Sequence, residues 1–481
     1  MSSQLPDDCL NEIFEYLEND TTTLHSCLLV NRLFCEIAIG ILWKNVCNSY
    51  YKPYISLSII NTLITCLPKE SKDHLHKNGI CISTQKPPLF NYPSFCKTIS
   101  IYKINYMIEY ALRNQRLITS AGDLNHSELL LSHEILKMFI NQISSLKSLD
   151  ISPGYTDRIE FIYSPEAKIC LKYLVELKCC SNICSAFFYQ ISEICHNIQS
   201  LTITFVKFII SDGIADLISL QSNLKSLTLE YCNKDIIRTI TPSLAKSSLT
   251  ITKLVLDTAN SPLSFISTFI NLQELVLHLD PDDPNAEGAF EGFGQLQYIK
   301  FPQLRILEFN CFSPKLEMLI KFLEINGKNL TKFNSSYDDK TMNLVKAKFC
   351  PNLKSLCVTI KEDEGDELEA LKLVLSSCQS LEIIAVHIDY ISITSKNLFD
   401  VLAKYLPKNL HKLTIGLFIS YKKLEGLEEF FINRNNCVPQ KPLSLTIITD
   451  LFGDIYDSDL KIIIEKYSKM GVIKEYEFFS I

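Results

Sequence analysis

Residues 224–233 read Leu-Lys-Ser-Leu-Thr-Leu-Glu-Tyr-Cys-Asn, and this stretch decides the fold. Its leucines at 224, 227 and 229 follow the pattern L-x-x-L-x-L. Leu227 and Leu229 alternate with polar residues, which is the period of a short β-strand with one apolar face. The pattern therefore predicts a strand whose leucines enter a core and whose polar residues lie on the open face.

The same pattern returns through most of the chain, with a spacing of about 26 residues, which is typical of repeat proteins. Helix-period stretches lie between the copies, most clearly at 132–143 and 367–375. A copy beginning at Cys96 fits as the first repeat, and residues 458–469 and 472–479 predict a final helix and strand. Further clear copies begin at Leu146, Ile198, Leu272, Leu304, Leu353, Leu381 and Leu410, and weaker ones at Leu174, Ile251 and Leu330.

The repeat length and the Cys-Asn ending at 232–233 resemble the leucine-rich-repeat family. One strand and one helix cannot bury their apolar faces alone, but stacked copies can. The resemblance implies an α/β fold in which a curved solenoid has a parallel β-sheet on its concave face and helices outside. A doubly wound α/β sheet also alternates strands and helices, but it would not keep this repeat and would need a glycine-rich phosphate turn. The chain has 14 glycines and no G-x-G-x-x-G motif.

The first 46 residues have a different pattern, which predicts three short helices. Threonines at 21–23 can cap a second helix, and a third apolar segment ends before Trp43. So small a module lies near the lower size limit for independent stability, so we expect it to complete its core with a partner. The stripe of the first helix consists of Leu10, Ile13, Phe14 and Leu17.

These residues closely resemble the F-box motif. The L-P opening at Leu5-Pro6, the first helix to Leu17, the central segment 28–34 and the ending Leu42-Trp43 are present in order. Phe34 stands where the family usually has Trp and keeps an aromatic side chain. The resemblance implies an N-terminal three-helix F-box that docks on a Skp-family adaptor, and through it on a cullin–RING scaffold. The solenoid would then hold a protein substrate for ubiquitination.

The resemblance also implies which residues would bind the adaptor. For each one the alternative is that it only packs the three helices together, because a stripe on a short helix does not say which neighbour it contacts. The predicted adaptor-binding residues are Leu5, Pro6, Leu10, Ile13, Leu17, Val30 and Trp43.

Variable positions of the repeat strands predict a binding face, because they lie opposite the helices. The predicted substrate-binding residues are Glu230, Asp257 and Glu308. They make this face acidic, so we expect it to attract a basic segment of the substrate. The alternative is an ordinary solvated sheet face. His278 and His387 have no partner at metal-ligand spacing, so we interpret them as surface histidines and predict no metal site.

Composition narrows the function class. The chain has 481 residues, a net charge of -7 and 47% hydrophobic residues, without a basic stretch typical of nucleic-acid binding. It shows neither a secretory signal peptide nor an apolar run of about 18 residues, so we expect no membrane span. Its 18 cysteines then predict reduced thiols and a cytoplasmic or nuclear location. A zinc site in the cluster at 179–196 is the alternative to packing of these thiols in the core.

No nucleophile–base order, phosphate loop or H-E-x-x-H motif is present, so we predict no enzyme and no cofactor. The predicted domains are an F-box at 1–46, a helical linker and solenoid cap at 47–95, and a solenoid with a C-terminal cap at 96–481. The predicted function is substrate recognition in a Skp–cullin–F-box ubiquitin ligase. The alternative is a leucine-rich-repeat scaffold or inhibitor that acts outside such a ligase.

Overall fold

The computed structural model describes most of the chain as two compact units. Unit 1 comprises residues 1–231 and 238–250, and unit 2 comprises 232–237 and 251–481. The described residues are 6–47, 52–82, 88–114, 123–151, 153–155, 158–258, 262–278, 292–310, 313–335, 340–360, 366–388, 395–417, 426–436, 441–449 and 458–480.

Unit 1 begins with the three predicted helices, α1 (Asp7–Glu15), α2 (Thr21–Cys27) and α3 (Arg32–Leu42). Asp20 caps α2 by accepting a hydrogen bond from the Thr23 amide at 3.0 Å, so the cap precedes the threonines at 21–23 that the sequence favoured. Asn31 caps α3 in the same way, with the Phe34 amide at 2.9 Å. The buried core of this helical module consists of Leu10, Phe14, Leu24, Ile37 and Ala38.

Three further helices lead from this module to the sheet. They are α4 (Pro53–Cys66), α5 (Lys69–Lys77) and α6 (Tyr92–Phe95). Pro53 and Pro93 each lie in the first turn of their helix, where the missing proline N–H costs no helical hydrogen bond. All three helices lie within residues 47–95, where the sequence predicted a helical linker.

The described residues form a sheet of 14 strands in sequence order from β1 to β14, with parallel pairing between neighbours such as β1 and β2 or β12 and β13. Because β1 and β14 are not neighbours, the sheet is not closed into a barrel. In unit 1 the leucines 149, 177, 201 and 227 pair in register across four strands, and all four are fully buried. The strands of unit 1 are β1 (Thr98–Ser100), β2 (Ser148–Asp150), β3 (Glu176–Cys180), β4 (Ser200–Thr204) and β5 (Ser226–Cys232). Its main helices are α7 (Ile101–Asn114), α8 (Leu124–Gln142), α9 (Pro165–Leu171), α10 (Ser185–Ile194) and α11 (Gly213–Ser219), and α12 (Lys234–Leu244) spans the boundary between the units.

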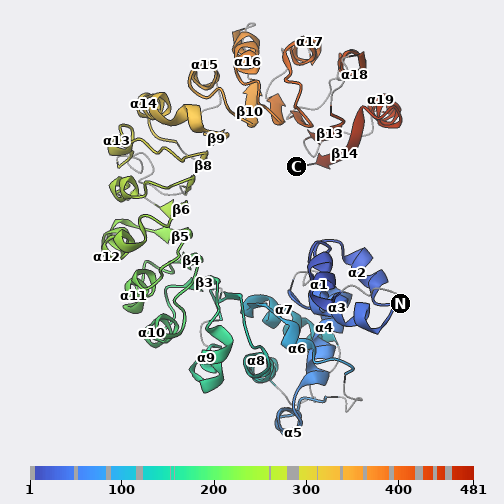
Figure 1. The fold of residues 1–481 in the computed structure, drawn as a ribbon, viewed down its shortest axis with the longest axis vertical. Helices are drawn as coiled ribbons and strands as arrows, with labels where there is room; N and C mark the ends of the chain where they lie inside the picture. The colour runs from blue at the N-terminus through green and yellow to red at the C-terminus, as the bar shows by residue number, and fades with distance from the viewer. Residues whose placement is uncertain are drawn as a thin grey trace. The chain divides into compact units, whose positions relative to one another are not determined.

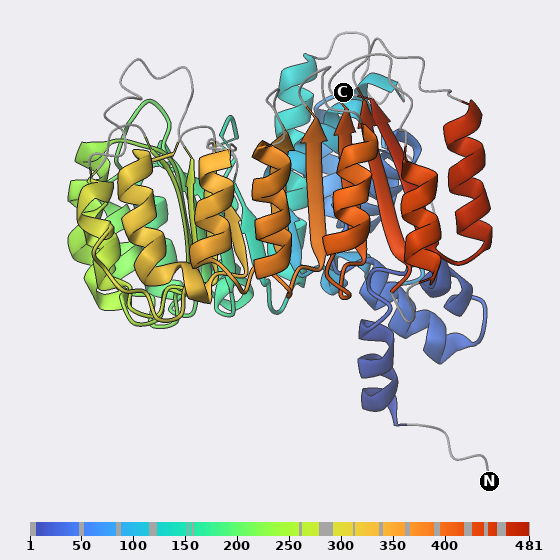
Figure 2. The same ribbon diagram turned by 90° about the horizontal axis from the view of Figure 1, so that it is seen from above.

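Unit 2 continues the same plan. Its strands line the inner side of an arc with helices on the outer side (Figure 1), and their arrows point in one direction (Figure 2). The strands are β6 (Lys253–Thr258), β7 (Glu274–His278), β8 (Ile306–Asn310), β9 (Lys332–Asn334), β10 (Ser355–Ile360), β11 (Ile383–Ile388), β12 (Lys412–Leu417), β13 (Leu443–Thr449) and β14 (Ile473–Ser480). The helices are α13 (Phe293–Leu296), α14 (Leu316–Asn326), α15 (Lys340–Phe349), α16 (Asp366–Ser377), α17 (Ser395–Tyr405), α18 (Leu427–Asn436) and α19 (Ser458–Lys469).

Every predicted repeat corresponds to a strand, and the α/β fold class with its parallel repeat sheet is confirmed. The sequence pattern missed β13, because Pro442 stands where the repeat has its first apolar residue. Helical cover is also thinner than predicted before β7, where the described residues form only a short 3-10 helix at Ser264–Thr268.

Buried cysteine thiols join successive repeats. The Cys195 thiol donates to the Leu171 carbonyl at 3.2 Å, and the Cys378 thiol donates to the Cys350 carbonyl at 3.3 Å. Burial raises the pKa of Cys195 and of Cys350 to about 12, so both thiols stay protonated at neutral pH. These contacts support the packing interpretation of the cysteines that precede repeat strands.

Two buried side-chain amides, those of Asn326 and Gln221, also join successive repeats. The Asn326 side chain accepts a hydrogen bond from the Phe301 amide at 2.8 Å and donates one to the Ile299 carbonyl at 2.9 Å. Gln221 is also buried, and it binds the Ile198 amide and the Cys195 carbonyl, each at 2.9 Å. Each amide satisfies backbone groups of the preceding repeat that would otherwise lack partners.

We expect Asn326→Leu to lower the stability of unit 2 by about 2–4 kcal/mol, since it orphans a buried N–H and a buried carbonyl. Asn352→Leu is the matched control, because Asn352 also binds the preceding repeat, through the Lys328 carbonyl at 2.9 Å, but is exposed. The control should cost less than about 1 kcal/mol, because water replaces the lost partner. Denaturant titration of both variants measures the difference, and equal losses would refute the role assigned to the buried amide.

Candidate functional site

The structure sorts the predicted adaptor-binding residues into packed and exposed ones. Leu10 is buried in the core of the helical module, and Leu17 packs against that core. Trp43 is half-buried and stacks against Tyr92 of α6, with ring centroids 4.6 Å apart. Leu5 lies outside the described residues. Leu10, Leu17 and Trp43 therefore have packing partners within this chain, and their contact with an adaptor stays a prediction.

Pro6, Ile13 and Val30 are exposed, with 49% exposure for Ile13 and 60% for Val30. Two further exposed apolar residues were missed by the sequence reasoning, Tyr16 at 92% and Leu29 at 90%. Tyr16 directly follows α1 and lies three residues after Ile13, so the two are neighbours, and neither belongs to the core of the module although Ile13 was part of the predicted stripe. Leu29 and Val30 lie together in the turn before α3.

We call Ile13, Tyr16, Leu29 and Val30 the exposed apolar group. Single apolar residues on a protein surface are common, whereas this small module has four large ones within residues 13–30. The sequence could have indicated that Tyr16 and Leu29 are exposed, because neither occupies a position of the apolar stripe of the first helix. Only the core contacts show that both side chains point away from it.

Carboxylates on the open sheet face of unit 1 are held in place by hydroxyl groups of the preceding strand. The Thr204 hydroxyl donates to Glu230 at 2.7 Å, the Ser100 hydroxyl to Asp150 at 2.9 Å and the Ser148 hydroxyl to Glu176 at 2.9 Å. Lys178 lies 3.4 Å from Glu176 and balances part of this charge. Each of these three carboxylates is therefore ordered by a hydroxyl of the neighbouring strand, and the role of Glu230 in substrate binding stays a prediction.

In unit 2 the two other predicted substrate-binding residues stand in different rows of the sheet. Asp257 on β6 pairs with His278 on β7, whereas Glu308 on β8 pairs with Val276. Glu308 also forms an ion pair with Lys332 of β9 at 2.5 Å. Asp257 and Glu308 are therefore not side by side, and Lys332 offsets the charge of Glu308.

The two histidines of this face are half-buried within their rows. The side-chain nitrogen of Asn310 lies 3.0 Å from Nδ1 and 3.3 Å from Nε2 of His278. The His387 ring packs over Gly416, where a Cβ atom would collide with it. Among the described residues, no group of three or more His, Cys, Asp or Glu side chains has a geometry that would hold a metal ion.

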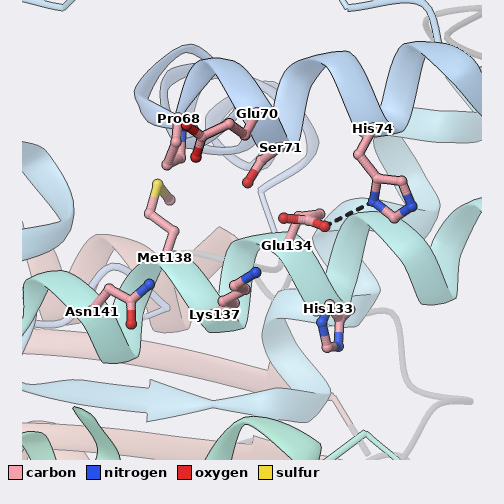
Figure 3. Close-up of a pocket in the computed structure, with 9 residues that line it drawn as sticks. All are labelled: Pro68, Glu70, Ser71, His74, His133, Glu134, Lys137, Met138 and Asn141. Carbon is pink, nitrogen blue, oxygen red and sulfur yellow. Dashed lines mark hydrogen bonds and ion pairs between the residues drawn. The ribbon is translucent and has the colours of Figure 1, made fainter. Parts of the chain in front are cut away.

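A pocket of about 410 Å³ lies between α5 and α8 (Figure 3). Its main contact joins His74 Nδ1 to Glu134 Oε1 at 2.9 Å. Burial alone would raise the pKa of Glu134, but hydrogen bonds from Ser71 and His74, with the charges of Lys137 and His133, lower it below its ordinary value. Glu134 therefore stays ionised, and its contact with His74 ties α5 to α8.

Comparison with protein families identifies the helical module. Residues 2–49 match the family model described as F-box-like. Comparison with curated proteins gives no match. In the part of the chain that the structure describes, no helix is long and apolar enough to cross a membrane. The F-box resemblance is thus confirmed, and the structure is consistent with leucine-rich repeats in the remainder of the chain.

Proposed function

We propose that this chain, which carries an F-box-like domain at residues 2–49, is the substrate receptor of a Skp–cullin–F-box ubiquitin ligase. The domain supports a role as an F-box protein in complexes of the ubiquitin ligase type, and F-box proteins are in general adaptors rather than enzymes. The match to the F-box-like family is the observation that carries the proposal.

The exposed apolar group supports docking of the domain on a Skp-family adaptor. Ile13 and Val30, with Pro6, are the predicted adaptor residues that remain exposed, and Tyr16 and Leu29 are exposed apolar residues close to them in sequence. Burying such side chains against an apolar partner contributes about 1.5–3 kcal/mol for each large residue fully buried. A cullin–RING scaffold would join through the adaptor, and Leu5 stays a prediction.

The repeat sheet supports substrate binding, because solenoids present extended surfaces of this kind. Glu230, Asp257 and Glu308 are proposed contacts for a substrate segment rich in Lys or Arg, whose approach the negative surface would accelerate. The protein itself makes or breaks no bond in this scheme. It raises the effective concentration of the substrate near a ubiquitin-conjugating enzyme. The role places the protein in the cytoplasm or nucleus, where thiols stay reduced.

Charge reversal tests the substrate side of this proposal. Tagged full-length chain is recovered from cells with the proteasome blocked, and co-purified proteins are quantified by mass spectrometry. The triple change of Glu230, Asp257 and Glu308 to Lys should reduce recovery of the proteins that proteasome inhibition enriches by about tenfold, with adaptor recovery unchanged. Wild-type capture should also weaken as salt rises, because exposed charges are screened over about 8–10 Å.

Three exposed acids on helices provide the control, Glu193, Asp216 and Glu324. Changing these three to Lys alters the net charge equally but leaves the sheet face intact, so capture should persist. Equal recovery of the enriched proteins by the sheet-face variant would show that its carboxylates only solvate the surface.

A further inference from the structure

Three residues other than glycine have a left-handed backbone in the described part of the chain. They are Lys207 with φ 51°, Phe208 with φ 57° and Tyr231 with φ 55°. This conformation is unfavourable for bulky side chains, because Cβ approaches the following carbonyl oxygen. All three lie in unit 1, just after β4 or near the end of β5.

Pairing of β4 with β5 places these residues at one edge of the sheet. Thr204 pairs with Glu230, and the Phe205 amide donates to the Glu230 carbonyl at 2.9 Å, so pairing continues one residue beyond β4. The chain then leaves the sheet in a turn that is fixed by two hydrogen bonds. The Val206 amide donates to the Ser181 hydroxyl at 3.1 Å, and the Ile209 amide donates to the Val206 carbonyl at 3.1 Å.

The strained backbone holds apolar side chains in water. Phe208 is 57% exposed, Ile209 48% and Tyr231 56%. About half of the area of each side chain therefore stays in solvent, and glycine would adopt the left-handed conformation without strain. Backbone strain combined with exposed apolar area, at two neighbouring strand ends, favours a role in binding.

The charge beside this edge specifies what would bind. Glu230 precedes Tyr231, and the Thr204 hydroxyl fixes its carboxylate at 2.7 Å. Asp150 and Glu176 lie on β2 and β3, three and two strands away from Glu230, and Lys178 lies 3.4 Å from Glu176, so Glu230 is the carboxylate that stands at this edge. Lys207 is the one cation in the segment 204–211, and it precedes Phe208 in the sequence. A complementary segment would set an apolar side chain against the rings and a cation against Glu230.

We propose that Phe208, Ile209, Tyr231 and Glu230 form a docking edge for an extended segment of a partner protein that carries an apolar residue next to Lys or Arg. The inference rests on the proposed function, in which this partner is the substrate. The rings act as anchors, because large aromatic side chains dominate the binding energy of protein interfaces. Glu230 sets the register of the segment through its ordered carboxylate.

Glycine substitutions separate binding from folding. Tyr231→Gly and Phe208→Gly remove a ring and also the left-handed strain, so each variant should melt at or above the wild-type temperature. Tyr231→Ala removes the ring and keeps an unfavourable backbone, so it should lose binding without this gain. Tyr189→Ala is the matched control, because Tyr189 is a 45% exposed tyrosine on α10 of the same unit.

The binding probe is a set of dodecapeptides selected from a phage-displayed library on the wild-type full-length chain. Selected peptides should combine an aromatic or aliphatic residue with Lys or Arg. Their affinity should fall about tenfold or more in Tyr231→Gly and Phe208→Gly, and also in Glu230→Gln, but stay unchanged in Tyr189→Ala. Fluorescence anisotropy of labelled peptides measures each affinity.

Several results would overturn the inference. The library could yield no binders, or the peptides could bind Tyr231→Gly with an affinity within about twofold of that for wild type. A glycine variant could also melt several degrees below the wild-type temperature. Wild-type dimers that dissociate in Tyr231→Gly would assign the edge to self-association instead. Peptide binding as expected, in a chain that fails to bind a Skp-type adaptor, would refute the proposed function and leave the docking edge intact.

Discussion

Replacing Leu227 by Ala is expected to remove about 2–5 kcal/mol of local stability from the β4–β5 region, whereas Thr228→Ala should change it by less than about 0.5 kcal/mol. Leu227 is fully buried and pairs with the buried Leu201, so its truncation leaves a cavity between sheet and helices. Thr228 is its neighbour on the opposite, half-buried face. The first change removes buried atoms from the core, and the second removes atoms from the open face.

Hydrogen exchange of the β4 and β5 amides is the appropriate measurement for this pair. Repeat proteins open locally, so exchange of these amides reports the loss at β4 and β5 directly. Protection of these amides should fall strongly in Leu227→Ala and remain near wild type in Thr228→Ala. Equal loss of protection in the two variants would contradict the register of β5.

The second large effect concerns the F-box-like domain. Ile13→Glu combined with Val30→Glu should weaken binding of a Skp-type adaptor by at least about a hundredfold, because two carboxylates would be buried at an apolar interface. Both side chains are exposed, so the helical module should keep its core of Leu10, Phe14 and Leu24. Circular dichroism checks the fold, and a binding titration checks the affinity.

Ile169→Glu combined with Ile462→Glu is the matched control for that variant. These isoleucines are 67% and 63% exposed on α9 and α19, far from the domain in sequence. The control carries the same chemical change and the same added charge, so it should bind the adaptor as wild type does. If both double variants lost binding equally, the effect would come from charge or solubility and not from the exposed apolar group.

Most of the fold was predictable because the repeat imposes one pattern many times. Each L-x-x-L-x-L copy corresponds to a strand, and the last helix has the predicted bounds Ser458–Lys469. β13 escaped because Pro442 interrupts the pattern where the first apolar residue belongs. The division into two units between residues 231 and 251 has no sequence signal, since the repeat and its composition continue across it.

The candidate site was only partly predictable. The α1 stripe is visible in the sequence, but its side chains Leu10 and Leu17 face the core of their own module, and spacing alone does not tell a core from an interface. The ion pair of Glu308 with Lys332 joins β8 to the next strand, β9, so it depends on the register between two repeats and not on the pattern within one. The left-handed Tyr231 was also hidden, because glycine is the residue that normally signals this conformation.

We propose that the F-box-like domain docks the whole chain on a Skp-type adaptor. Titration of purified full-length chain with a purified Skp1-type adaptor, followed by light scattering, tests it most directly. We expect a saturable one-to-one complex of chain and adaptor, which forms with wild type and with the Ile169→Glu/Ile462→Glu control. It should not form with Ile13→Glu/Val30→Glu. A folded wild-type chain that remains alone at saturating adaptor concentration would contradict it.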